Sequence, residues 1–135
     1  MLTLTSDMET GVEKIDEQHR ELIKRINAVV SMGTLAVAKE ETQKTIDFLG
    51  EYIVSHFKDE EVLQKQSGYP KHERHKEQHQ GYINEFKKLK EEFLKNGPSG
   101  TFTIKLNTSI INLIVRHIKS DDVEFGKYYK EQQKR

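Results

Sequence analysis

The sequence predicts an all-α fold: an antiparallel up-down four-helix bundle with a short N-terminal arm and a C-terminal extension. Four long segments carry apolar residues at spacings of three and four, the periodicity of a helix with one buried face. Only Pro70 and Pro98 interrupt the chain, and charged residues (33%) and hydrophobic residues (34%) are balanced as in amphipathic helices. Four such helices joined by short connections favour the up-down arrangement.

The first two helices are expected from about Glu13 into the thirties and from near Glu40 to the turn at Ser67. The apolar stripe of the first contains Ile15, His19, Leu22, Ile23, Ile26, Val29 and Val30. The stripe of the second contains Ile46, Leu49, Ile53, His56, Glu60 and Leu63. Ser31, Gly33 and Thr34 weaken the end of the first helix. Gly68 suits the end of the second, and Pro70 suits the start of the third.

The third helix is expected to bury a stripe of His75, His79, Tyr82, Phe86, Leu89 and Phe93. Five turn-forming residues, Asn96 to Gly100, then mark the clearest break in the chain. The fourth helix is expected to bury Ile104, Leu106, Ile110, Leu113, Ile114, His117 and Ile118. A short charged tail follows, with one further helical piece through Tyr128 and Tyr129.

Composition narrows the class of protein. The 135 residues suit one domain, 1–135, and the 22 basic and 22 acidic residues cancel. Without a basic field, nucleic acid is not an expected partner. The chain has no cysteine, so disulfides and thiolate metal sites are excluded. The start MLTLTSDMETG lacks the features of a signal peptide, and no apolar run approaches 18 residues, so we expect a cytoplasmic protein and no membrane partner.

Five of the six histidines continue the apolar stripe of their own helix: His19, His56, His75, His79 and His117. A single histidine on an apolar face is usually an ordinary core residue. Five imidazoles in one small core are different, because each buried polar atom left unpaired costs about 1–3 kcal/mol. One metal centre would satisfy them together. The spacing of four also places Glu60 on the face of His56 and His79 on the face of His75.

The remaining polar residues near these positions receive other interpretations. His72 lies beside the Pro70 turn, and we expect it to be a solvated histidine at a helix start. Asp59 and Glu61 flank Glu60 but point elsewhere on a helix, so we expect them at the solvated surface. A second carboxylate ligand is harder to choose. Asp121 would share the face of His117 if the helix continued, whereas Asp122 lies about 140° away on an ideal helix. Ser120 and the two aspartates could instead end one helix and begin another, so periodicity leaves the choice open.

Five motifs in order resemble the hemerythrin family, and more closely its single-domain bacteriohemerythrins. These are Gly11–His19 (GVEKIDEQH), His56–Glu60 (HFKDE), Gly68–Pro70 (GYP), His75–His79 (HKEQH) and His117–Asp122 (HIKSDD). The resemblance covers nearly the whole chain and selects Asp122 as the second carboxylate. One departure is Leu4, since many bacterial relatives have a tryptophan seven residues before the glycine that matches Gly11. This departure does not involve the ligands.

The resemblance implies two iron ions with a bridging oxo or hydroxo group. It assigns His75, His79 and His117 to one ion, His19 and His56 to the other, and Glu60 and Asp122 to both. The first ion is then full, and the second has one open position for dioxygen, held as hydroperoxide. Five apolar residues match the family's oxygen-pocket positions: Leu22, Phe57, Leu113, Ile114 and Ile118.

Three hypotheses follow. The favoured one is an oxygen-binding protein, not an enzyme, that serves in transport, storage or sensing. The second is a di-iron enzyme or sensor that handles peroxide or nitric oxide. The third is a metal-free or zinc-bound helical interaction module. A sensing role would require an unidentified protein partner or the charged end from Lys127 to Arg135.

Overall fold

A computed structural model describes residues 2–34, 39–97 and 100–134. After a short 3-10 turn, η1 (Ser6–Met8), come three long helices, α1 (Glu13–Thr34), α2 (Lys39–Gln66) and α3 (His72–Asn96). The remainder is α4 (Gly100–Leu106), the π-helical turn η2 (Asn107–Ile111), α5 (Asn112–His117), a second π-helical turn η3 (Ile118–Asp122) and α6 (Val123–Gln133). Within these ranges the chain is helical, with no strand.

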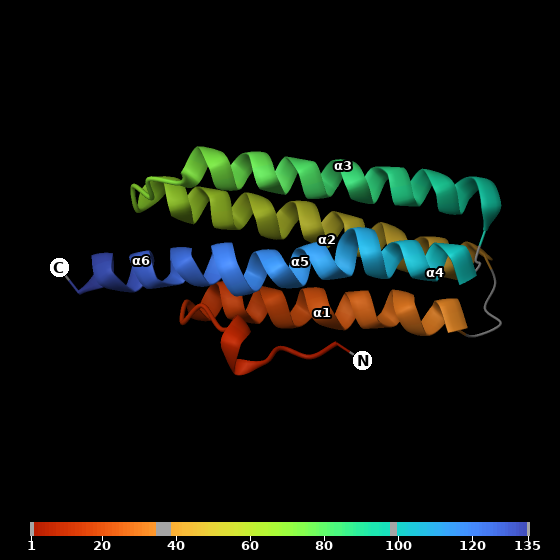
Figure 1. The fold of residues 1–135 in the computed structure, drawn as a ribbon, viewed down its shortest axis with the longest axis horizontal. Coiled ribbons are helices and arrows are strands. Elements are labelled where there is room, and N and C mark those ends of the chain that lie inside the picture. The colour runs from red at the N-terminus through yellow and green to blue at the C-terminus, as the bar shows by residue number, and fades with distance from the viewer. Residues whose placement is uncertain (1, 35–38, 98–99, 135) are drawn as a thin grey trace.

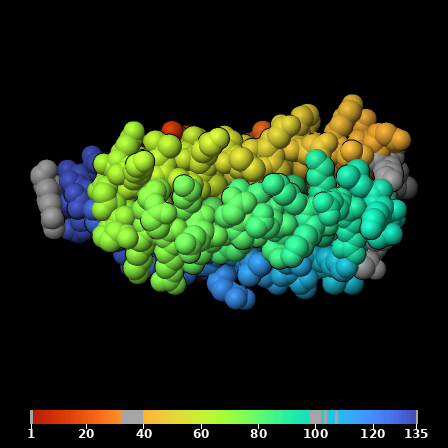
Figure 2. Space-filling view, turned by 90° about the horizontal axis from the view of Figure 1, so that it is seen from above, coloured from red at the N-terminus to blue at the C-terminus, as the bar shows by residue number. Residues whose placement is uncertain are grey.

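The helices form the expected antiparallel up-down bundle (Figure 1). Contacts run from α1 to α2, from α2 to α3, from α3 to α4 and back from α4 to α1, so each rod packs on its two neighbours. Seen from above, α2 and α3 cover one side of the molecule and the end of α6 projects beyond them (Figure 2). Gly68 (φ 70°) and Gly97 (φ 71°) take the left-handed conformation at the ends of α2 and α3. The expected break at Asn96–Gly100 follows α3, although Pro98 and Ser99 lie outside the described residues.

The expected tail is not a separate piece. The fourth helix runs on from α5 through η3 into α6 without a break (Figure 1). One of the two sequence interpretations had the cluster Ser120-Asp121-Asp122 end one helix and begin another. The structure contradicts it, because the helix continues through these residues. Instead the helix widens there, because the Val123 N–H donates to the carbonyl of Ile118, five residues earlier.

The two π turns align the buried face of this helix. A buried residue occurs at every fourth position from Phe102 on: Phe102, Leu106, Ile110, Ile114, Ile118 and Asp122. In an α-helix, at about 100° per residue, the twenty residues from first to last would rotate the stripe by about 200°. Each π turn contains about one residue more than an α turn, and this extra residue reverses the rotation of the stripe by about 100°. The stripe consequently stays on one face along the whole helix.

Two residues of the predicted stripe lie elsewhere. Ile104 is 65% exposed, because Phe102 and Leu106 hold the inward positions on either side of it. Leu113 is only partly buried, since the turn at η2 directs Ile110 and Ile114 inward instead. The sequence prediction was wrong for Ile104 because two residues, about 200° on an α-helix, separate it from Leu106. It was wrong for Leu113 because it assumed an unbroken α-helical period.

The N-terminal arm packs along α1 (Figure 1). The side chain of Asn27 accepts from the Leu2 N–H at 3.1 Å and donates to the Leu2 carbonyl at 2.8 Å. Leu4 is partly buried against the main core, and Met8 is 1% exposed within it. Among the described residues, no helix is long and apolar enough to cross a membrane.

Candidate metal centre

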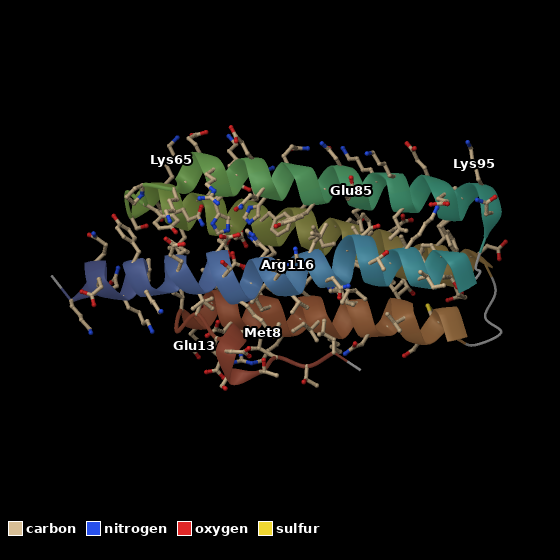
Figure 3. All side chains as sticks on the ribbon, in the orientation of Figure 1. Met8, Glu13, Lys65, Glu85, Lys95 and Arg116 are labelled. Carbon is tan, nitrogen blue, oxygen red and sulfur yellow. The ribbon has the colours of Figure 1, made fainter. Side chains whose placement is uncertain are left out.

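Seven side chains from all four rods of the bundle converge in its interior. Each is at most 3% exposed: His19 on α1, His56 and Glu60 on α2, His75 and His79 on α3, His117 on α5 and Asp122 in η3. Side-chain nitrogen and oxygen atoms gather between the helices near the passage from α5 to α6, whereas Lys95 points away from the bundle (Figure 3). The structure thus brings together every residue that the sequence analysis named as a ligand.

The imidazoles form a group of three and a group of two. In the first group, ring centroids are 4.5 Å apart for His75 and His79, 4.6 Å for His75 and His117, and 5.1 Å for His79 and His117. In the second group, the rings of His19 and His56 are 4.8 Å apart. All five rings turn Nε2 toward the two carboxylates.

Each carboxylate gives one oxygen to each group. Glu60 Oε1 lies 2.7 Å from Nε2 of His75 and 3.4 Å from that of His79, while Oε2 lies 3.8 Å from Nε2 of His56. Asp122 repeats this arrangement. Its Oδ1 lies 2.8 Å from Nε2 of His75 and 3.1 Å from that of His117, while Oδ2 lies 3.0 Å from Nε2 of His19. The carboxylates are therefore shared between two sets of ligand atoms, each set within 4.8 Å.

The central atoms have the properties that a metal site requires. Among the described residues, Nε2 of His19, His79 and His117 and both oxygens of Glu60 are buried without a hydrogen-bond partner. These atoms lie close to one another but are not aligned for hydrogen bonds. Leaving them unpaired would cost about 1–3 kcal/mol each. Imidazole nitrogens and carboxylate oxygens are ligands for iron, zinc and manganese, so the residues fit a pair of divalent cations.

The charges of the centre hold the carboxylates ionised. Burial and the negative charge of Asp122 both favour protonated Glu60, but the nearby imidazoles outweigh them and lower its pKa. Burial likewise opposes ionisation of Asp122, but His117, His19 and His75 hold its pKa well below the usual value. Burial also opposes protonation of His75, yet Asp122 and Glu60 raise its pKa to about 10. For His56 the largest influence is burial, which opposes protonation and lowers the pKa to about 4.

Comparison with known proteins matches the part of the chain that contains these seven residues. The family model of the hemerythrin HHE cation-binding domain matches residues 10–129. The chain belongs to the hemerythrin family. It is 31% identical to a bacteriohemerythrin of Stenotrophomonas maltophilia over 93% of this chain and 80% of that protein. A bacteriohemerythrin of Methylococcus capsulatus is 25% identical over 93% of this chain and 94% of the relative.

The fold agrees with that assignment. A crystal structure of wild-type hemerythrin superposes with a TM-score of 0.82, covering 96% of this chain and 98% of that one at 24% identity. The predictions of the family and of an all-α bundle are therefore confirmed. Membership of the hemerythrin family and the buried His/Glu/Asp cluster together support a di-iron protein.

Three acids outside the central set are hydrogen-bonded to its histidines, two of them directly and one through a glutamine. His79 Nδ1 donates to Glu61 at 2.9 Å, and His117 Nδ1 donates to Asp121 at 3.0 Å. Asp59 accepts from Gln18 Nε2 at 2.8 Å, and Gln18 Oε1 in turn accepts from His56 Nδ1 at 2.8 Å. The prediction that Asp59 and Glu61 are free surface acids was wrong. A helix rotation of about 100° per residue moves them off the buried stripe, but only as far as a neighbouring helix.

Gln18 was not singled out by the sequence analysis, although it directly precedes His19. A side chain beside one ligand cannot face that ligand's metal, but here it reaches a ligand on the next helix. The sequence does carry a signal for such residues, because a polar residue stands next to each predicted ligand. His72 lies outside the central set, as predicted, but its side chain is only 18% exposed and is less solvated than expected.

Four of the five apolar residues expected at the oxygen pocket belong to the buried core. Leu22, Phe57, Ile114 and Ile118 are at most 3% exposed. The ring of Phe57 stacks on His79 with centroids 3.9 Å apart and planes within 4°, and it lies 5.8 Å from the His56 ring. Leu113, the fifth residue expected here, is only partly buried and lies outside the core cluster.

Proposed function

We propose that this hemerythrin binds dioxygen reversibly at two iron ions that share a bridging oxo or hydroxo group. The observation that carries the proposal is the unequal division of histidines, three and two, around two shared carboxylates. On this proposal His75, His79 and His117 hold one ion, His19 and His56 hold the other, and Glu60 and Asp122 bridge them.

Counting ligands shows why the division matters. Each ion would receive one oxygen from Glu60, one from Asp122 and one from the bridging group. Three histidines would complete a coordination number of six on the first ion. Two histidines would bring the second ion to five, so one position would remain for a small ligand. An open position on one ion only suits a diatomic molecule that binds end-on.

A pair of iron(II) ions, when bound, supplies the two electrons that allow dioxygen to be held and later released. The protein's part is to keep water and protons from the bound ligand. Leu22, Phe57, Ile114 and Ile118 place apolar groups around the centre, and an apolar shell disfavours the loss of charged products into water.

The nearby acids favour a carrier over an enzyme. Turnover of peroxide would require a free acid or base within reach of the open position. Glu61 and Asp121 already accept hydrogen bonds from His79 and His117, and Asp59 accepts one from Gln18. The acids described around the centre are thus engaged in orienting ligands.

An optical oxygen titration tests the proposal. Protein reduced without air and carrying two irons per chain should gain a charge-transfer band on addition of dioxygen and lose it under vacuum. Irreversible oxidation at the first exposure, or catalytic turnover of peroxide or nitric oxide well above that of free iron, would overturn it.

Matched histidine variants localise the response. His56→Gln should abolish the reversible band, because it removes one of the two histidines beside the open position. His72→Gln should leave the band intact, since His72 lies outside the centre. Loss of the band in both variants would contradict the assignment of His56.

A further inference from the structure

The histidines of this centre have unlike outer partners. His79 and His117, in the group of three, each donate their Nδ1–H to a carboxylate, Glu61 and Asp121. His56, in the group of two, donates instead to the neutral amide of Gln18 at 2.8 Å. Negative charge therefore contacts histidines of the group of three, and an uncharged group contacts a histidine of the group of two.

Asp59 determines which end of the Gln18 amide faces His56. A carboxylate only accepts hydrogen bonds, so the oxygen of Asp59 at 2.8 Å must face the amide NH2 of Gln18. The amide oxygen is then directed at His56 Nδ1. An acceptor at that position keeps the proton on Nδ1 and leaves the Nε2 lone pair for a metal.

The connection also joins two helices. Gln18 lies on α1 and Asp59 and His56 lie on α2, so the hydrogen bonds cross the packed face between the rods that carry His19 and His56. Gln18 and Asp59 are both partly buried. The ring of His56 is held both by its own helix and by its neighbour.

We propose that Asp59 and Gln18 act as a positioning pair that fixes the tautomer of His56 without placing a charge on it. A carboxylate hydrogen-bonded to a ligating histidine raises the basicity of that ligand and favours the more highly charged oxidised metal. The neutral amide withholds this effect from the open ion, which keeps that ion more easily reduced. The inference rests on the two-ion centre proposed above, but its metal-binding test does not require dioxygen.

The first test removes the acceptor. Gln18→Met retains the length of the side chain but cannot accept the Nδ1–H of His56. In chelator competition with zinc, one of the two ions should be released with about 10–100-fold lower affinity, and the other should be retained as in the unaltered protein. Gln133→Met, at the exposed end of α6, is the matched control and should bind both ions normally. If Gln18→Met bound each ion as tightly as the unaltered protein does, the proposal would be overturned.

The second test moves the charge while conserving it. Gln18→Glu combined with Asp59→Asn places the carboxylate directly on His56 and an amide behind it. The net charge and the number of hydrogen bonds stay the same, but the amide at position 59 now donates to the carboxylate at position 18. Both ions should bind, and the reduction potential of the iron-loaded protein should fall and its autoxidation should quicken. A potential equal to that of the unaltered protein would reject the charge argument even if Gln18→Met failed to fold.

A control separates this effect from a general change of surface charge. Glu51→Gln alters an exposed acid two turns earlier on α2 and should leave the potential and both affinities unchanged. Failure of the unaltered protein to bind dioxygen would contradict the proposed function alone, because zinc affinity and reduction potential are measured without dioxygen.

Discussion

At the scale of single residues, the adjacent acids Asp121 and Asp122 have different partners. Asp122 is 1% exposed and lies within 3.1 Å of Nε2 on three histidines. Asp121 bonds to the outer nitrogen of His117, and its side chain is 26% exposed. One carboxylate thus faces the centre, whereas the other orients a ligand from outside.

Substituting each aspartate distinguishes these positions. Asp122→Asn should retain fewer than two ions per chain, because it removes a negative oxygen from both ions. Asp121→Asn should retain both, with an affinity lower by at most about 10–100-fold, because its amide oxygen can still accept from His117 Nδ1. Metal analysis after gel filtration measures the difference. Retention of two ions by Asp122→Asn, with loss in Asp121→Asn, would reverse the assignment.

His75 makes metal binding dependent on pH. Its pKa of about 10 in the metal-free protein exceeds its ordinary value of 6.5, so below pH 6.5 its protonation stabilises the fold fully, and this stabilisation is lost as pH rises through about 10. A metal must displace that proton. Between pH 7 and 9, the affinity of the three-histidine position should therefore rise about tenfold per unit.

Proton release measures this linkage directly. Adding zinc to weakly buffered metal-free protein at pH 8 should liberate at least about one proton per chain, the one held by His75. His56, with its pKa lowered to about 4 by burial, is already neutral and should contribute none. Binding with no release of protons would show that His75 is neutral before the metal arrives.

At the scale of elements, the π turn η3 decides which aspartate faces inward. In an α-helix the residue four after His117 shares its face, and that residue is Asp121. The wider turn lets Asp122, five residues on, lie with His117. The same turn keeps Phe125 of α6, which is completely buried, in line with the stripe above it.

Inserting one alanine after Ser120 should disrupt this turn, because the π turn already holds one residue more than an α turn. Asp122 would then lie six residues after His117, and α6 would rotate by about 100°. We expect loss of metal binding and a lower unfolding temperature. Ser120→Ala is the control, since Ser120 is exposed and the turn keeps its length. Circular dichroism and metal analysis report both effects, and an insertion variant that still binds two ions would show that the register of the turn is not required.

At the scale of the whole molecule, the centre ties all four rods together. Its candidate ligands come from α1, α2, α3 and the α5–η3 segment, so a bound metal would link every helix to the others. The turn between α2 and α3 is joined to α6 by separate contacts, because the Tyr128 hydroxyl donates to the carbonyls of Ser67 at 2.9 Å and Gly68 at 3.0 Å. Beside it, the backbone of Thr10 packs closely against Gly126.

Removal of metal should destabilise the entire bundle. A metal at a hundred times its dissociation constant adds about 2.7 kcal/mol to the free energy of unfolding. For a domain of this size the metal-free protein should unfold on the order of 10 °C lower. Thermal unfolding of chelator-treated protein, with zinc restored as the control, measures this shift. Equal unfolding temperatures would mean that the centre does not link the helices.

The sequence by itself determined the bundle and most of the centre. Apolar residues at spacings of three and four specify helices wherever they occur, and the five histidines lie on those same stripes. The positions of His19, His56, Glu60, His75, His79 and His117 in the interior therefore follow from local periodicity. The inward position of Asp122 was expected only from family resemblance, because periodicity left the choice between Asp121 and Asp122 open.

The tertiary structure decided what periodicity cannot express. The π turns that align Asp122 and leave Leu113 only partly buried are local departures from 3.6 residues per turn, held by packing against the other helices. The partners of Gln18, Asp59 and Glu61 lie across helix interfaces, so no spacing within one helix reveals them. Local periodicity thus determines which side chains point into the bundle, whereas the packing of the helices determines which side chains contact one another.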